Sequence, residues 1–252
     1  MNEFDPATES TPTSPAGSPT LGERISDVIV APVRAMTATA ERPMWWAPAL
    51  LVFVVMFLYT ALNAHLLMPA QTEMQLENAP AGQVEMLEEQ LELFRDPPIW
   101  LRILSGLGAG FGVTILGGLV FALITHMFLK LSEGEGRLGQ SVGVVFWAGL
   151  IAYGLKPIIS WVILLATGSV HAAGLTVASL LPDPDPGSVT YVLASMFGDP
   201  FVWWMIGVVA IGMAIAHRMT FGRATTVVVA TYLLLSAILV GFTLVGQAVS
   251  GA

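Results

Sequence analysis

Long apolar stretches alternate with shorter polar segments over most of the chain. A helix needs about 20 residues to cross the hydrocarbon core of a bilayer, at about 1.5 Å per residue. Five stretches have this length, at about residues 44–67, 101–131, 141–167, 200–217 and 224–249. Lipid offers the backbone no hydrogen-bond partner, so each stretch must be helical. We therefore predict an all-α fold, a polytopic membrane helix bundle of five transmembrane helices that occupies residues 43–252.

The N-terminal part of the chain has a different character. Residues 1–20 are rich in Pro, Ser and Thr and are expected to form a disordered tail, because they cannot bury enough apolar surface to fold. Residues 21–42 predict an amphipathic helix and a linker, with Ile25 and Val28 on one face and Pro32 ending or bending the helix. Such a helix suits the membrane surface. The alternative is a short cytosolic helix packed on the bundle.

Composition excludes several classes of protein. Of the 252 residues, 55% are hydrophobic and 11% are charged, whereas a soluble domain has about 25% charged residues. A soluble globular enzyme is therefore the wrong expectation. The formal charge of −8 argues against nucleic acid as a partner, because binding phosphates needs clustered Lys and Arg. The chain has no Cys, which excludes disulfides and thiolate metal sites.

The basic residues indicate how the helices cross the membrane, since cytoplasmic loops carry an excess of Lys and Arg. Seven basic residues flank the predicted spans on the side of the N-terminus and two flank them on the other side. The seven are Arg24, Arg34, Arg42, Lys130, Arg137, Arg218 and Arg223, and the two are Arg95 and Arg102. Because five spans place the termini on opposite sides, we predict a cytoplasmic N-terminus and a C-terminus outside.

A run of glycines lies in the second predicted span. Gly106 with Gly110, and Gly108 with Gly112, form two overlapping G-x-x-x-G pairs. Small residues four positions apart on a helix form a groove that a second helix can approach closely. The run lacks the Gly-Lys-Ser/Thr ending of a phosphate-binding loop. It indicates helix packing, either between two copies of the chain in a homodimer or within one bundle.

Lys156 is the most informative single residue of the predicted spans. It lies 15 residues beyond Ser141, which is about 22 Å along a straight helix. An ammonium group at the centre of a bilayer costs about 2.5–3.5 kcal/mol on the insertion scale. Pro157 follows it and Gly154 precedes it, so we expect a bent or broken third helix.

Two interpretations of Lys156 stay open. One is a substrate or anion site at the break. The other is a lysine whose four-carbon stem reaches the membrane interface. No Asp or Glu within a predicted span offers itself as a partner for this charge.

Motifs for catalysis give no positive signal. The four histidines are too far apart in the sequence for an H-E-x-x-H metal site. No predicted span contains a carboxylate pair for acid–base chemistry. We therefore predict no catalytic residue, no metal site and no cofactor.

Three stretches resemble the Yip-domain membrane proteins, named for eukaryotic members that interact with Rab/Ypt GTPases, and specifically their bacterial branch. Residues 25–48 look like the family's opening segment, with a Pro after an apolar helix and then a Pro and aromatics before the first span. Residues 138–165 resemble its third-span region, with a Tyr-Gly step and a Pro. Residues 196–235 resemble its unit of spans four and five, which opens with Asp-Pro-Phe. The likeness covers most of residues 21–249.

The resemblance implies five transmembrane helices, a cytosolic N-terminus and a place in the bacterial inner membrane. For eukaryotic relatives it implies roles in membrane traffic and membrane shaping. The chain has no Asp-Leu-Tyr-Gly-Pro motif before the first span, so Rab binding does not carry over. The bacterial branch supplies no established reaction or ligand.

The main functional hypothesis is a non-enzymatic, Yip-type protein that organises lipid or scaffolds partners. It would act through helix packing and the surface helix at 21–31, with the bilayer, a second copy of the chain or other membrane proteins as partners. The alternative is a transporter or channel at the predicted break around Lys156–Pro157. An intramembrane enzyme is a third hypothesis, against which the absence of paired catalytic groups argues.

Overall fold

The computed structural model describes residues 20–76, 82–181 and 189–250, and every regular element among them is helical. Within this part of the chain, four helices are long and apolar enough to cross a membrane: Ile99–Leu131, Leu138–Thr167, Pro200–His217 and Phe221–Gly241. A bent pair, Trp46–Leu62 and Ala64–Glu73, brings the number of crossings to five if it counts as one span. The prediction of an all-α polytopic bundle is confirmed. The predicted tail lies, apart from Thr20, outside the described residues.

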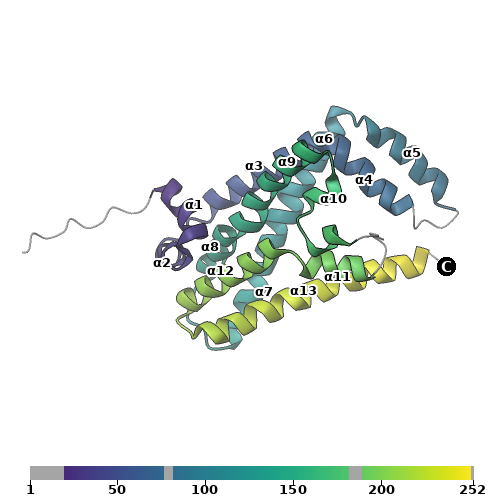
Figure 1. Ribbon diagram of the computed structural model, residues 1–252. Helices are drawn as coiled ribbons and strands as arrows, with labels where there is room; N and C mark the ends of the chain where they lie inside the picture. Colours follow the sequence, from purple (N-terminus) through teal and green to yellow (C-terminus); the bar gives the residue numbers. More distant parts are fainter. Residues whose placement is uncertain (1–19, 77–81, 182–188, 251–252) are drawn as a thin grey trace, which may run out of the picture.

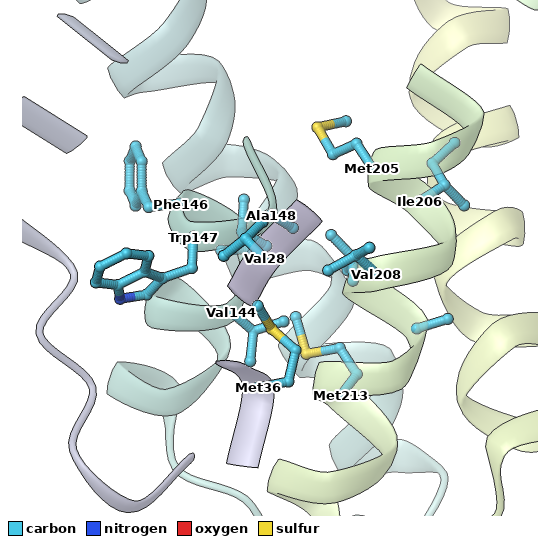
Figure 2. Packing of buried hydrophobic residues seen from close by; sticks show 14 of the residues in the cluster. Val28, Met36, Val144, Phe146, Trp147, Ala148, Met205, Ile206, Val208 and Met213 are labelled. Atoms are coloured by element: carbon cyan, nitrogen blue, oxygen red, sulfur yellow. The ribbon is translucent and has the colours of Figure 1, made fainter. Parts of the chain in front are cut away.

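The first two helices pack on the bundle. Helix α1 (Leu21–Val30) is capped by the side chain of Thr20, and helix α2 (Pro32–Glu41) follows after a single residue. A proline suits the first position of a helix, where its missing N–H would have no helical partner. Val28 of α1 and Met36 of α2 are fully buried in the core (Figure 2). The contacts of α1 and α2 therefore match the alternative of a helix packed on the bundle.

The helix of the first predicted span, 44–67, bends at Asn63. Helix α3 (Trp46–Leu62) ends there, and the Asn63 side-chain amide donates to the carbonyl of Tyr59 at 2.7 Å. Helix α4 (Ala64–Leu76) continues at an angle of 71°. Helix α5 (Val84–Arg95) packs along α4, and the two extend from the end of the bundle opposite to α1 (Figure 1).

The second span is one helix of 33 residues with a π-helical centre. It consists of α6 (Ile99–Leu107), η1 (Gly108–Leu116) and α7 (Gly117–Leu131). A Cβ on Gly106 would lie 2.9 Å from the carbonyl oxygen of Phe57 in α3, and one on Gly110 would be as close to a phenylalanine ring of that helix. This glycine pair packs within the bundle. A Cβ on Gly108 or Gly112 would meet no described atom within 4 Å, so the second pair faces outward.

The third span is continuous, and the prediction that it breaks around Gly154 and Pro157 is wrong. The segments α8 (Leu138–Gly149), η2 (Leu150–Leu155) and α9 (Lys156–Thr167) form one helix of 30 residues. Pro157 lacks the N–H that an α-helix needs at this point. The helix accommodates it by widening to a π-helical turn, in which the Lys156 N–H donates to the carbonyl of Ile151, five residues back.

The third and fourth spans form the centre of the bundle. The chain after α9 forms α10 (Val170–Ala173), η3 (Val177–Leu180), α11 (Val189–Phe197), α12 (Pro200–His217) and α13 (Phe221–Ser250). Half of the residues in the apolar part of the third span are buried, and the same holds for the fourth span. The buried fraction is only 17% in the second span and 22% in the fifth. The second and fifth spans thus present most of their apolar surface to lipid, and α13 runs along one side of the bundle (Figure 1).

The core is tightly packed where α2, α8 and α12 meet. Figure 2 shows Met36 of α2 beside Val144 of α8 and Met213 of α12. A Cβ on Gly212 would lie 2.5 Å from Val144 and 2.8 Å from the Met36 sulfur. The N-terminal helices and the spans therefore share one core.

Candidate functional site

Lys156 forms an ion pair with Asp199, which lies just before α12. The Lys156 Nζ donates to Asp199 Oδ2, and only 21% and 7% of the two side chains are exposed. The other oxygen, Oδ1, accepts from the backbone N–H groups of Phe201 at 2.9 Å and Val202 at 3.2 Å. One carboxylate thus neutralises a lysine of the third span and caps the N-terminus of the fourth, where the helix dipole also favours a negative charge.

The partner of Lys156 escapes the sequence analysis because Asp199 lies in a loop, one residue before the predicted fourth span. The register of the third and fourth spans explains the contact once their packing is known. Ser141 and His217 are 2.9 Å apart at the other end of the same two helices. Lys156 lies about 22 Å from Ser141 along the third span, and Asp199 lies about 27 Å from His217 along the fourth. The two residues are therefore at similar heights in the bundle. A lysine side chain can bridge this difference.

The ion pair changes the interpretation of Lys156 that the sequence left open. A carboxylate neutralises its charge, and Lys156 is not among the residues that line the cavity described below. Gly154 and Pro157 are buried within a continuous helix. The transporter hypothesis thereby loses both the helix break and the free charge on which it depended.

A cavity of about 530 Å³ lies beside Asp199. Its walls come from η1, α7, α8, η2, α11, α12 and α13, and most of them are apolar. The polar residues that line it are Tyr153, Ser195, Asp199, Tyr232 and Ser236. The Tyr232 hydroxyl donates to the carbonyl of Met196 at 2.8 Å, which joins α13 to α11. The cavity is therefore an apolar space with polar groups gathered near the start of α12.

A second buried polar cluster joins three spans near the other end of α12. The Ser141 Oγ lies 2.9 Å from His126 Nδ1 and 2.9 Å from His217 Nε2. A serine beside a histidine resembles a nucleophile with its base. However, Ser141 is fully buried, so a substrate cannot reach it. Among the described residues, no group of three or more His, Asp or Glu is placed to hold a metal ion.

A third cluster fixes the N-terminal helices to the third span. Arg24 is 6% exposed, and its guanidinium lies 4.7 Å from the ring centre of Trp147 in α8, a cation–π contact. It also donates to the carbonyl of Arg42 at 3.3 Å. Burial lowers the pKa of Arg24, and the positive charge of Arg42 lowers it further. Buried Asp27 pairs with Arg34, which joins α1 to α2.

Comparison with known proteins places this architecture in a family. No curated protein and no solved structure matches the chain. The family model of the Yip1 domain matches residues 26–244, a range that includes half of α1, all of α2 and every span. With apolar helices long enough to cross a bilayer, the chain is an integral membrane protein that belongs to the Yip1-domain family.

Proposed function

We propose that the protein acts without catalysis, by organising the membrane or by scaffolding partner proteins. The observation that carries this proposal is the use of its buried polar groups. Lys156 bonds Asp199, Ser141 bonds two histidines, and Arg24 docks on Trp147. These groups join helices to one another and make the N-terminal helices and the spans one unit. Such a unit acts through its surfaces.

Affinity capture from native membranes in a mild detergent tests this role, with lipids and proteins both identified. We expect a protein or a lipid class to be enriched over its abundance in the membrane. The exposed apolar residues Val30 and Val33, 75% and 59% exposed, are the best candidates for a contact surface of α1 and α2. Replacing both with serine should reduce the enrichment. Leu180→Ser, at an 81% exposed site of η3, is the control; an unchanged profile for the Val30/Val33 variant contradicts the role of this surface.

The proposed setting is the bacterial inner membrane, with the N-terminus cytoplasmic and the C-terminus outside. The loop after the second span is joined to the end of α12 by the pair Arg218–Glu135 at 3.3 Å and to the start of α13 by the pair Arg223–Glu133 at 3.4 Å. Figure 1 shows α1 and the end of α13 at opposite ends of the bundle. Reporter enzymes fused to the two termini should be active in different compartments. Activity of both in the same compartment overturns this topology.

We further propose that the outward-facing Gly108 and Gly112 form the contact between two copies of the chain. Because the chain has no native cysteine, a single cysteine at Leu104, which is 57% exposed, should give a disulfide-linked dimer in oxidised membranes. Adding Gly108→Leu should abolish this dimer, because a bulky side chain keeps the two backbones apart. Gly207→Leu, at an open position of α12, is the control. A dimer that persists with Gly108→Leu rejects the interface.

A further inference from the structure

We propose that the cavity beside Asp199 binds one acyl chain of a membrane phospholipid. Its volume of about 530 Å³ is that of a small-molecule site, which typically measures about 300–1,000 Å³. Its walls are apolar except at one end, so it fits a long apolar chain attached to a polar group. This site goes beyond the scaffolding role and does not depend on it.

The cavity opens sideways, on the surface that faces lipid. Val113 and Val120 of the second span line it and are 59% and 48% exposed. Ile238 of the fifth span lines it from the other side and is 45% exposed. An occupant therefore enters between two lipid-facing helices, from the hydrocarbon of the bilayer. Acyl chains are the molecules that surround this opening.

The cavity has the depth of one leaflet. Its lining extends from Asp199, just before α12, to Val209, which lies ten residues further along the chain. Ten residues correspond to about 15 Å of helix. The hydrocarbon core of a bilayer is about 30 Å thick, so one leaflet accounts for about 15 Å. Val209 is fully buried and Met205 is 7% exposed. An acyl chain in contact with Val209 and Met205 lies inside the bundle, unlike the lipids that only cover its outer surface.

Tyr153 supplies a hydrogen-bond donor for the polar end of the ligand. Its side chain lines the cavity, as does Asp199. Asp199 is occupied by Lys156 and two backbone N–H groups, and the Tyr232 hydroxyl donates to Met196. The Tyr153 hydroxyl, by contrast, donates to no group of the described residues. It is therefore available to an ester carbonyl at the head of an acyl chain.

Photolabelling of the purified full-length chain in lipid nanodiscs tests the site. We choose two forms of phosphatidylcholine, with a diazirine either near the ester or near the methyl end of one acyl chain. The first should label the segment around Tyr153, and the second should label α12 near Val209. Labelling confined to exposed residues outside the cavity, such as Leu123, with none on α12, overturns the proposal. So does a reversed pattern for the two probes, because it places the ester at the apolar end.

A filling variant separates cavity binding from surface contact. Gly117 lines the cavity, and a Cβ there would meet no described atom within 4 Å, so Gly117→Leu should fold and occupy the space. Each buried methylene group contributes about fourfold to affinity, so a leucine that displaces two should reduce labelling of α12 about 15-fold. Gly207→Leu, also in open space but outside the cavity, should label like the wild type. Equal labelling of α12 in Gly117→Leu and Gly207→Leu overturns the assignment.

The same nanodiscs test two further points, the hydrogen bond from Tyr153 and whether the bound acyl chain belongs to a phospholipid. Tyr153→Phe removes one hydrogen bond and should weaken labelling of α12 about two- to tenfold while leaving labelling of exposed positions unchanged. No effect of this substitution overturns the role of Tyr153. A free fatty acid that carries the same diazirine is the comparison. If it labels α12 and the phospholipid does not, the ligand is not a phospholipid and the proposal fails.

Discussion

Replacing Lys156 with methionine is expected to destabilise the protein by about 3–5 kcal/mol, because the substitution leaves the Asp199 carboxylate buried without its counter-charge. Asp199 is 7% exposed as a side chain and keeps only its two backbone donors in the variant. Thermal unfolding in detergent, followed by tryptophan fluorescence, should show a clearly lower midpoint. Methionine is also a long, unbranched side chain, so the main property that Lys156→Met changes is the charge.

The double variant Lys156→Met/Asp199→Asn is the control for this prediction. Asparagine retains the ability to cap α12 and removes the remaining charge. Replacing a whole buried pair with neutral groups is often neutral or stabilising, so the double variant should recover most of the lost stability. If it unfolds as easily as the single variant, the ion pair is not what holds the third and fourth spans together.

The same double variant distinguishes the two functional hypotheses. A scaffold whose fold has recovered should again capture the partners that the wild type captures. A transporter that used the charge of Lys156 would stay inactive, because the charge is gone even though the fold is restored. The measurement is the affinity-capture profile of the double variant beside that of the wild type.

The membrane helices could be predicted from the sequence because they depend on length and apolarity alone. The predicted fourth span at 200–217 has the same limits as α12. The predicted second span at 101–131 differs from the observed helix, Ile99–Leu131, by two residues at its start. In lipid, a run of about 20 apolar residues has no stable alternative to a helix.

The contacts between the helices could not be predicted in the same way. His126, Ser141 and His217 are brought together by the packing of three spans, and no local pattern connects them. The amphipathic pattern of α1 indicates only that one face is apolar. Such a face can be buried in lipid or in a protein core equally well. The π-helical turn before Pro157 likewise depends on how the neighbouring helices hold the third span in place.

Gly212→Ala is expected to destabilise the protein by about 1–3 kcal/mol, although alanine is the better helix former by about 1 kcal/mol. The added methyl group would lie 2.5 Å from Val144 Cγ1 and 2.8 Å from the Met36 sulfur. Methionine is flexible and can move, but the β-branched Val144 has one preferred rotamer in a helix and cannot. The strain therefore falls on the junction of α2, α8 and α12.

Gly207→Ala is the matched control, because it adds the same methyl group to the same helix where no described atom lies within 4 Å. It should be neutral or slightly stabilising in the same thermal unfolding assay. Combining Gly212→Ala with Val144→Ala restores space for the methyl group and should recover part of the loss. Hydrogen exchange of α2 should be faster in Gly212→Ala than in Gly207→Ala, because Met36 is the contact that α2 loses. Equal stability and equal exchange in the two variants would mean that α2 does not dock on the spans, and the case for one rigid scaffolding unit would fail with it.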